Sequence, residues 1–143
     1  MAFRASSQSQ ADGYAKSKQI ANQLKSYCQD VKTQMEAGPV SGNLAVALHE
    51  RLISDRASLI TISNIPGIVA YAQAQENDPS YNLAAEFTAM TNAIATVRDW
   101  LITNASTTGW VTFSLTGVAT KTFSSAATAG LRTQLDSLIA TIA

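Results

Sequence analysis

The side chains of this sequence that could do chemistry are few. His49 is the only histidine and Cys28 the only cysteine in 143 residues. Any Ser-His-Asp or Cys-His arrangement must therefore use one of them, and the sequence contains no G-x-S-x-G elbow. We expect His49 to be a surface or interface residue on the flank of a helix. We expect Cys28 to be a small buried side chain, because its neighbours at helical spacing are apolar.

Metal and phosphate sites are not indicated either. One histidine, one cysteine and no carboxylate cluster with calcium-loop spacing leave no pattern typical of a metal site. The seven glycines are scattered, and no G-x-x-x-x-G-K-[ST] stretch occurs. The sequence therefore predicts a protein that is not an enzyme, with no catalytic residue, no cofactor and no metal.

The charge pattern excludes some partners. Lys plus Arg equals Asp plus Glu, ten of each, and charged residues are 14% of the chain, against roughly 25% in an average domain. No basic excess indicates specific nucleic-acid binding, and no stretch approaches the roughly 18 apolar residues of a membrane helix. We expect Arg51, Asp55 and Arg56 on a solvated, mixed-charge helix face. A weakly charged surface favours association with other subunits.

Helical periodicity dominates the first hundred residues and predicts a mainly α protein, a helical bundle of four to five helices. Apolar residues recur at steps of three and four, which places them on one face of a helix. The predicted stripes are Ile20, Leu24, Cys28 (or Tyr27), Val31 and Met35; Leu44, Leu48, Leu52 and Leu59 or Ile60; Leu83, Phe87, Met90, Ile94, Val97 and Leu101; and Leu131, Leu135, Leu138 and Ile142.

Turn residues set the expected boundaries of these helices. The first helix is expected over residues 14–37, and a short helix over 67–77 follows the break at Ile65-Pro66. Asp78 can cap the next helix, with Pro79 at its first position. Residues 1–13 are expected to form a flexible arm, or a helix only when docked. Residues 14–143 are expected to form a single helical domain.

One β-hairpin is expected before the C-terminal helix, at about residues 109–123. Val111, Phe113 and Leu115 alternate with polar residues, and the connection ends in Gly117, which permits the positive φ of a tight turn. A lone two-stranded hairpin is only marginally stable in water. We therefore expect it to pair with or lie on a partner, which suggests a second subunit.

Two stretches carry a resemblance to known proteins: "GIVAYAQAQENDPSYNLAAEFTAMTNAIATVRDWLI" at 67–102 and "KTFSSAATAGLRTQLDSLIATI" at 121–142. Together they resemble a family of small proteins encoded among the structural genes of tailed bacteriophages. The shared pattern is Tyr-Ala-Gln, Asp-Pro-x-Tyr, Val-x-x-Trp, a hairpin and a final Ala-Gly-Leu-Arg helix. The resemblance implies a virion structural protein, and it implies no enzymatic activity.

By analogy of size and helix content, the resemblance suggests an oligomeric ring subunit in the neck, at the head-to-tail connection, or in the adjoining tail. It would be assembled in the bacterial cytoplasm and found in the virion. The expected partners are further copies of the chain and other virion proteins, either a portal-side adaptor or tail components. The assembly contacts are hypothesised to lie in the hairpin and the arm, at Phe3, Arg4, Trp110, Phe113, Val118 and Phe123.

Two alternatives stay open. One is a soluble assembly chaperone or helical adaptor that is absent from the mature particle. The other is a small enzyme or enzyme inhibitor, which would require His49, Cys28 or a carboxylate to lie in a cleft.

Overall fold

The computed structural model describes residues 2–36, 42–107 and 125–142, and all the regular structure in these ranges is helical. The helices are α1 (Ala2–Glu36), α2 (Gly42–Ser63), α3 (Ile68–Glu76), α4 (Leu83–Thr107) and α6 (Ser125–Ile142). The expectation of a mainly α protein is confirmed. The hairpin expected at 109–123 lies outside the described residues and stays a prediction.

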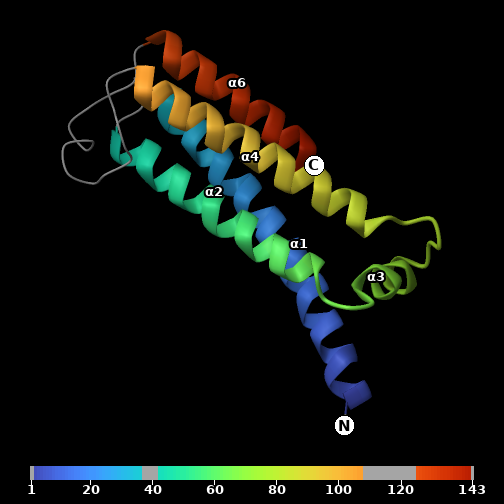
Figure 1. Cartoon of the computed structure of the whole chain (residues 1–143). Coiled ribbons are helices and arrows are strands. Elements are labelled where there is room, and N and C mark those ends of the chain that lie inside the picture. The colour runs from blue at the N-terminus through green and yellow to red at the C-terminus, as the bar shows by residue number, and fades with distance from the viewer. Residues whose placement is uncertain (1, 37–41, 108–124, 143) are drawn as a thin grey trace.

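The four long helices form an antiparallel bundle (Figure 1). Successive long helices run in opposite directions, and their main contacts follow the order α1–α2–α4–α6 and back to α1. The short helix α3 lies at one end of the bundle, in the connection between α2 and α4, where it packs against α1 and α4.

The predicted apolar stripes form the core of the bundle. One contiguous cluster of buried side chains draws on all five helices. Its fully buried large members are Leu24, Val31, Leu48, Leu52, Leu59, Ile68, Ile94, Leu101, Leu131, Leu135 and Leu138. Where the sequence left two candidates open, Leu59 is buried and Ile60 is 38% exposed, and Cys28 is buried while Tyr27 is only partly so. The 3.6-residue period therefore placed these faces correctly.

The start of α1 differs from the expectation. The helix was expected to begin near Tyr14, but it begins at Ala2. Residues 2–13 contain no proline, and they are rich in Ala, Gln and Ser, of which Ala and Gln favour helix strongly. The segment has small polar residues and no apolar stripe, so periodicity gives no signal of a helix there. Figure 1 shows these first turns extending past the α3 end of the bundle.

The start of α4 also differs. Asp78 was expected to cap this helix with Pro79 inside it, but α4 begins at Leu83. The Asp78 carboxylate instead accepts hydrogen bonds from the backbone N–H and the hydroxyl of Ser80, at 2.9 and 2.7 Å. The cap is Asn82, whose Oδ1 accepts a bond of 3.1 Å from the N–H of Ala85. Asp78 therefore closes a turn, and the helix begins only after it.

Left-handed residues flank α3 at both ends. Gly67 has φ +77° and Asn77 has φ +53°. The N–H of Asp78 donates to the carbonyl of Gln73 at 3.0 Å, which closes the C-terminal end of α3. The two backbone reversals turn α3 out of line with α2 and α4, so it can lie against α1.

Replacing Gly67 by alanine is expected to lower the free energy of unfolding by about 1 to 2 kcal/mol, because a Cβ disfavours the left-handed region. Asparagine tolerates that region better than alanine does, so Gly67→Asn is expected to fall between the two. Chemical denaturation of the three proteins checks this order. An alanine variant as stable as the glycine parent would contradict it.

Candidate functional site

The six residues hypothesised to make assembly contacts are not tested by the structure. Trp110, Phe113, Val118 and Phe123 lie outside the described residues. Phe3 and Arg4 belong to the first turns of α1, whose backbone is described although these two side chains are not. These six assignments therefore stay predictions.

His49 is half-buried on α2, as expected for a residue beside the stripe. Burial lowers the pKa of its imidazole, and the charge of Arg98 lowers it further, while Glu50 acts in the opposite direction. Within the described residues, no group of three or more His, Cys, Asp and Glu side chains could hold a metal ion.

The stability of the protein is expected to fall as the pH is lowered through the range from 7 to 5. An imidazole whose folded pKa lies below its unfolded value of about 6.5 takes up its proton more readily in the unfolded chain. Its contribution to stability is therefore present above pH 6.5 and is lost as the pH falls toward the folded pKa. Thermal unfolding midpoints measured between pH 7 and 5 check this.

The matched variant is His49→Gln. Its thermal unfolding midpoint is expected to change little between pH 7 and 5. The pKa values of Glu76 and Asp78 are also lowered. Their contributions are lost only below pH values of about 4.5, so they do not overlap with this window. A wild-type profile as flat as that of the variant would contradict the expectation.

Cys28 is fully buried in the core, and its interpretation as a small buried side chain is confirmed. Burial raises the pKa of its thiol to about 12. A thiol is a poor nucleophile when it is protonated and excluded from solvent. The placement of Cys28 therefore gives no support to a role as a nucleophile.

A cluster of hydroxyl and charged groups lies at the α3 end of the bundle, and the sequence pattern does not predict it. The hydroxyl of Tyr14 donates to Oε1 of Glu76, and Nζ of Lys18 lies 2.8 Å from the same oxygen. The ammonium group also lies 4.5 Å from the centroid of the Tyr14 ring, and the ring of Tyr71 packs edge-on against Tyr14 at 6.0 Å. These contacts fasten α3 to α1.

A second phenol fastens the loop before α4. The hydroxyl of Tyr81 donates to Oε2 of Glu86 at 2.8 Å, and its backbone carbonyl accepts a bond of 3.0 Å from the side chain of Gln73. Gln73 belongs to α3, Tyr81 to the loop and Glu86 to α4, so the sequence alone does not indicate that they meet. Of the bonds in this cluster, only that between Tyr81 and Glu86 joins residues close enough in sequence for a contact to be predicted.

The tyrosines of this cluster act as hydrogen-bond donors. Burial, and next the bond to the Glu76 carboxylate, raise the pKa of Tyr14 to about 12. Burial also raises the pKa of Tyr81, with the bond to Glu86 as the next cause. Both phenols therefore stay protonated near neutral pH, where they cannot act as general bases. The arrangement is suited to positioning α3 and the loop before α4.

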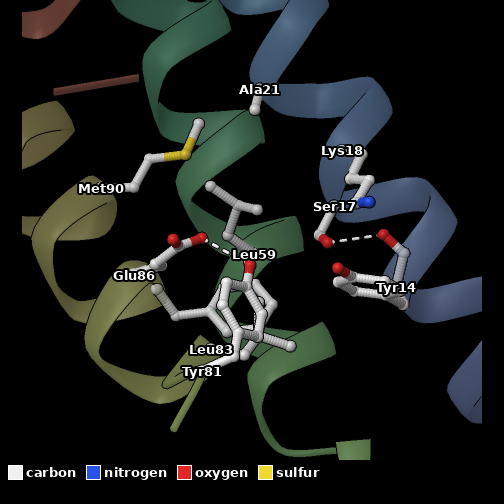
Figure 2. A pocket seen from close by; sticks show the side chains of 10 residues that line it. Tyr14, Ser17, Lys18, Ala21, Leu59, Tyr81, Leu83, Glu86 and Met90 are labelled. Atoms are coloured by element: carbon white, nitrogen blue, oxygen red, sulfur yellow. Dashed lines mark hydrogen bonds between the residues drawn. The ribbon is translucent and has the colours of Figure 1, made fainter. Parts of the chain in front are cut away.

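A pocket of about 80 Å³ lies beside this cluster, between α1 and α4 (Figure 2). Its apolar lining comes from Leu59, Leu83, Phe87 and Met90, and its polar lining includes Tyr14, Ser17, Lys18, Tyr81 and Glu86. Small-molecule sites typically begin at about 300 Å³, so this pocket is too small for a cofactor and has the size of a site for a single side chain.

The outer face of α2 carries the most exposed large apolar side chains of this helix. Ile53 is 45% and Ile60 is 38% exposed, and they lie seven residues apart on one face. Between them lie the exposed side chains of Ser54 and Ala57 and the partly exposed side chain of Arg56, whose Nε donates to the carbonyl of Thr91 at 3.2 Å. On α4, Ile102 is 44% exposed. We call the α2 face from Ile53 to Ile60 the α2 stripe.

No helix within the described ranges is both long and apolar enough to span a membrane. Comparison of the chain with protein-family models, with curated proteins and with solved structures found no match.

Proposed function

We propose that this protein is a structural subunit that acts by self-association. Following the resemblance, we further propose that it serves in a tailed bacteriophage particle, as a ring subunit of the neck or the adjoining tail. Its partners would be further copies of itself and neighbouring virion proteins.

The observation that carries self-association is the α2 stripe. Single exposed apolar residues are common on monomers and need no explanation. Two isoleucines aligned on one helix face, where the nearest cation, Arg56, is bonded to a carbonyl of α4, make a surface that favours contact with protein. The low charge of the chain as a whole, 14%, adds to this tendency. The described side chains also include no cluster suited to metal chemistry.

Charge placed on the α2 stripe tests the proposal. The double variant Ile53→Lys/Ile60→Lys is expected to sediment as a monomer at concentrations where the wild type is oligomeric, because burying two ammonium groups at an interface is costly. The matched control is Gln19→Lys/Ser26→Lys, two exposed positions on α1 with the same seven-residue spacing. If the Ile53→Lys/Ile60→Lys variant sediments like the wild type, this face has no role in self-association.

The placement in a virion has a separate test. Mass spectrometry of purified particles from a host that produces this chain is expected to detect it at a fixed ratio to the other structural proteins. A chain present during assembly but missing from the finished particles would instead identify an assembly chaperone.

A further inference from the structure

The pocket beside Tyr14 opens to solvent between α1 and α4. Figure 2 shows Lys18 and Ala21 on the α1 side and Glu86 and Met90 on the α4 side. The lining residues that keep exposed surface are Lys18, Ala21, Tyr81, Glu86 and Met90, and those buried at the base are Tyr14, Ser17, Leu59, Leu83 and Phe87. The pocket therefore has a polar, charged mouth and a buried base that is mainly apolar.

The hydroxyl groups of the pocket have already donated their protons. Tyr14 donates to Glu76, and Tyr81 donates to Glu86. Ser17 donates to the carbonyl of Tyr14 at 2.7 Å. A hydroxyl has a single proton, so each of these three oxygens presents only lone pairs to a further group. The hydroxyl part of the lining therefore favours a ligand that donates hydrogen bonds.

The two phenols have similar partners, but only one of them is accompanied by a cation. Nζ of Lys18 lies 2.8 Å from Oε1 of Glu76 and 4.5 Å from the centroid of the Tyr14 ring. Glu86 forms no ion pair with any residue in the described ranges. Two carboxylates, Glu76 and Glu86, against the one ammonium of Lys18 leave a net charge of −1 at the mouth. Lys18 thus shows how an ammonium group lies against a phenol–carboxylate pair, and the second pair is open to another.

The base of the pocket suits a short alkyl chain. Leu83 and Phe87 are 4% and 6% exposed, and Met90 is partly buried beside them. Apolar carbons that enter the pocket leave water, which favours binding. The volume of about 80 Å³ sets the limit of a single short chain.

We propose that this pocket binds one alkylammonium group. The ammonium donates to Glu86 and to the phenol oxygen of Tyr81, and the alkyl chain lies against Leu83 and Phe87. A free primary amine and a lysine side chain of another protein both supply this chemistry. The site goes beyond the proposed function and does not depend on self-association.

Methionine methyl resonances test the site in the full chain. Protein labelled at its methionine methyl groups is titrated with n-propylammonium at constant ionic strength and followed by NMR. Met90 lines the pocket, while Met35 is buried about 25 Å further along α1 than Lys18 and serves as the internal reference. We expect a saturable shift of the Met90 resonance, with a dissociation constant in the millimolar range for so small a ligand, and no shift of Met35.

A neutral analogue and a matched pair of variants separate charge from apolar contact. We expect n-propanol to bind at least about tenfold more weakly than n-propylammonium, because it lacks the charge. Glu86→Gln keeps an acceptor for Tyr81 and is expected to weaken n-propylammonium binding about tenfold. The control Glu50→Gln, at an exposed carboxylate outside the pocket, is expected to bind like the wild type. An unchanged Met35 resonance verifies the core of each variant.

A Met90 resonance that does not respond to n-propylammonium, or equal binding of n-propylammonium and n-propanol, would overturn the proposal. Nα-acetyllysine methylamide then distinguishes the source of the group. If it binds at least as tightly as n-propylammonium, the site takes a lysine side chain of another protein. If only n-propylammonium binds, the mouth excludes a peptide backbone and the site takes a free amine.

Discussion

Replacing Leu52 by alanine is expected to lower the free energy of unfolding by about 2 to 5 kcal/mol. Leu52 is completely buried in the core of the bundle, on the helix that packs against both α1 and α4. Truncation removes three carbons from close packing and leaves a cavity that two rigid neighbours cannot fill. Chemical denaturation monitored by circular dichroism measures the loss.

The adjacent residue supplies the control. Ile53 loses the same number of carbons in Ile53→Ala, but it is 45% exposed, so the expected loss is below about 1 kcal/mol. Alanine has the higher helix propensity in both cases, and the gain over isoleucine exceeds that over leucine by only a few tenths of a kcal/mol. Equal losses for the two would contradict the assignment of inner and outer faces of α2.

Replacing Arg51 by methionine is expected to cost about 2 to 3 kcal/mol, because it leaves a carboxylate largely buried without its cation. The Nε of Arg51 donates to Oδ2 of Asp55 at 2.8 Å, and Asp55 is only 9% exposed. The guanidinium also lies 5.3 Å from the centroid of the Tyr27 ring. Methionine preserves most of the apolar stem, so the change reports mainly on the lost charge.

Arg98→Met is the control, since its partner Asp99 has a side chain that is 64% exposed and surface pairs of this kind contribute about 0 to 1 kcal/mol. Adding Asp55→Asn to Arg51→Met is expected to recover part of the loss, because it removes the uncompensated charge. If the second change deepens the loss instead, the carboxylate is not what destabilises the first variant.

Much of the bundle could be predicted from the sequence because its helices are amphipathic. Leu24, Leu48, Leu101 and Leu135 lie at helical spacing within their segments, and all are fully buried. Such periodicity reports burial directly, since only one face of a helix meets the core. The break at Ile65-Pro66 was equally predictable, because proline restricts the residue before it.

One error concerned a residue whose burial depends on the packing of another helix. Asp55 was expected on a solvated face, but it is only 9% exposed and pairs with Arg51, whose guanidinium lies over the ring of Tyr27 on α1. The spacing of Arg51 and Asp55 by four residues is a normal surface pattern, and nothing local distinguishes a buried pair from an exposed one.

The candidate site shows the same dependence on tertiary contacts. Tyr14 and Glu76 are 62 residues apart in sequence, yet their side chains are hydrogen-bonded. Neither residue belongs to a motif, and Tyr14 was treated only as the start of a helix. The pocket beside Tyr14 could not be foreseen either, because its lining comes from three helices, α1, α2 and α4, and from Tyr81.

Self-association can be measured directly as the native mass of the full chain, by light scattering after size-exclusion chromatography over a wide range of concentrations. We expect a discrete species whose mass is a whole multiple of the 15.1 kDa subunit and whose subunit number is constant once assembly is complete. A single species of 15.1 kDa at every concentration would contradict the proposal that this protein acts by assembling with copies of itself.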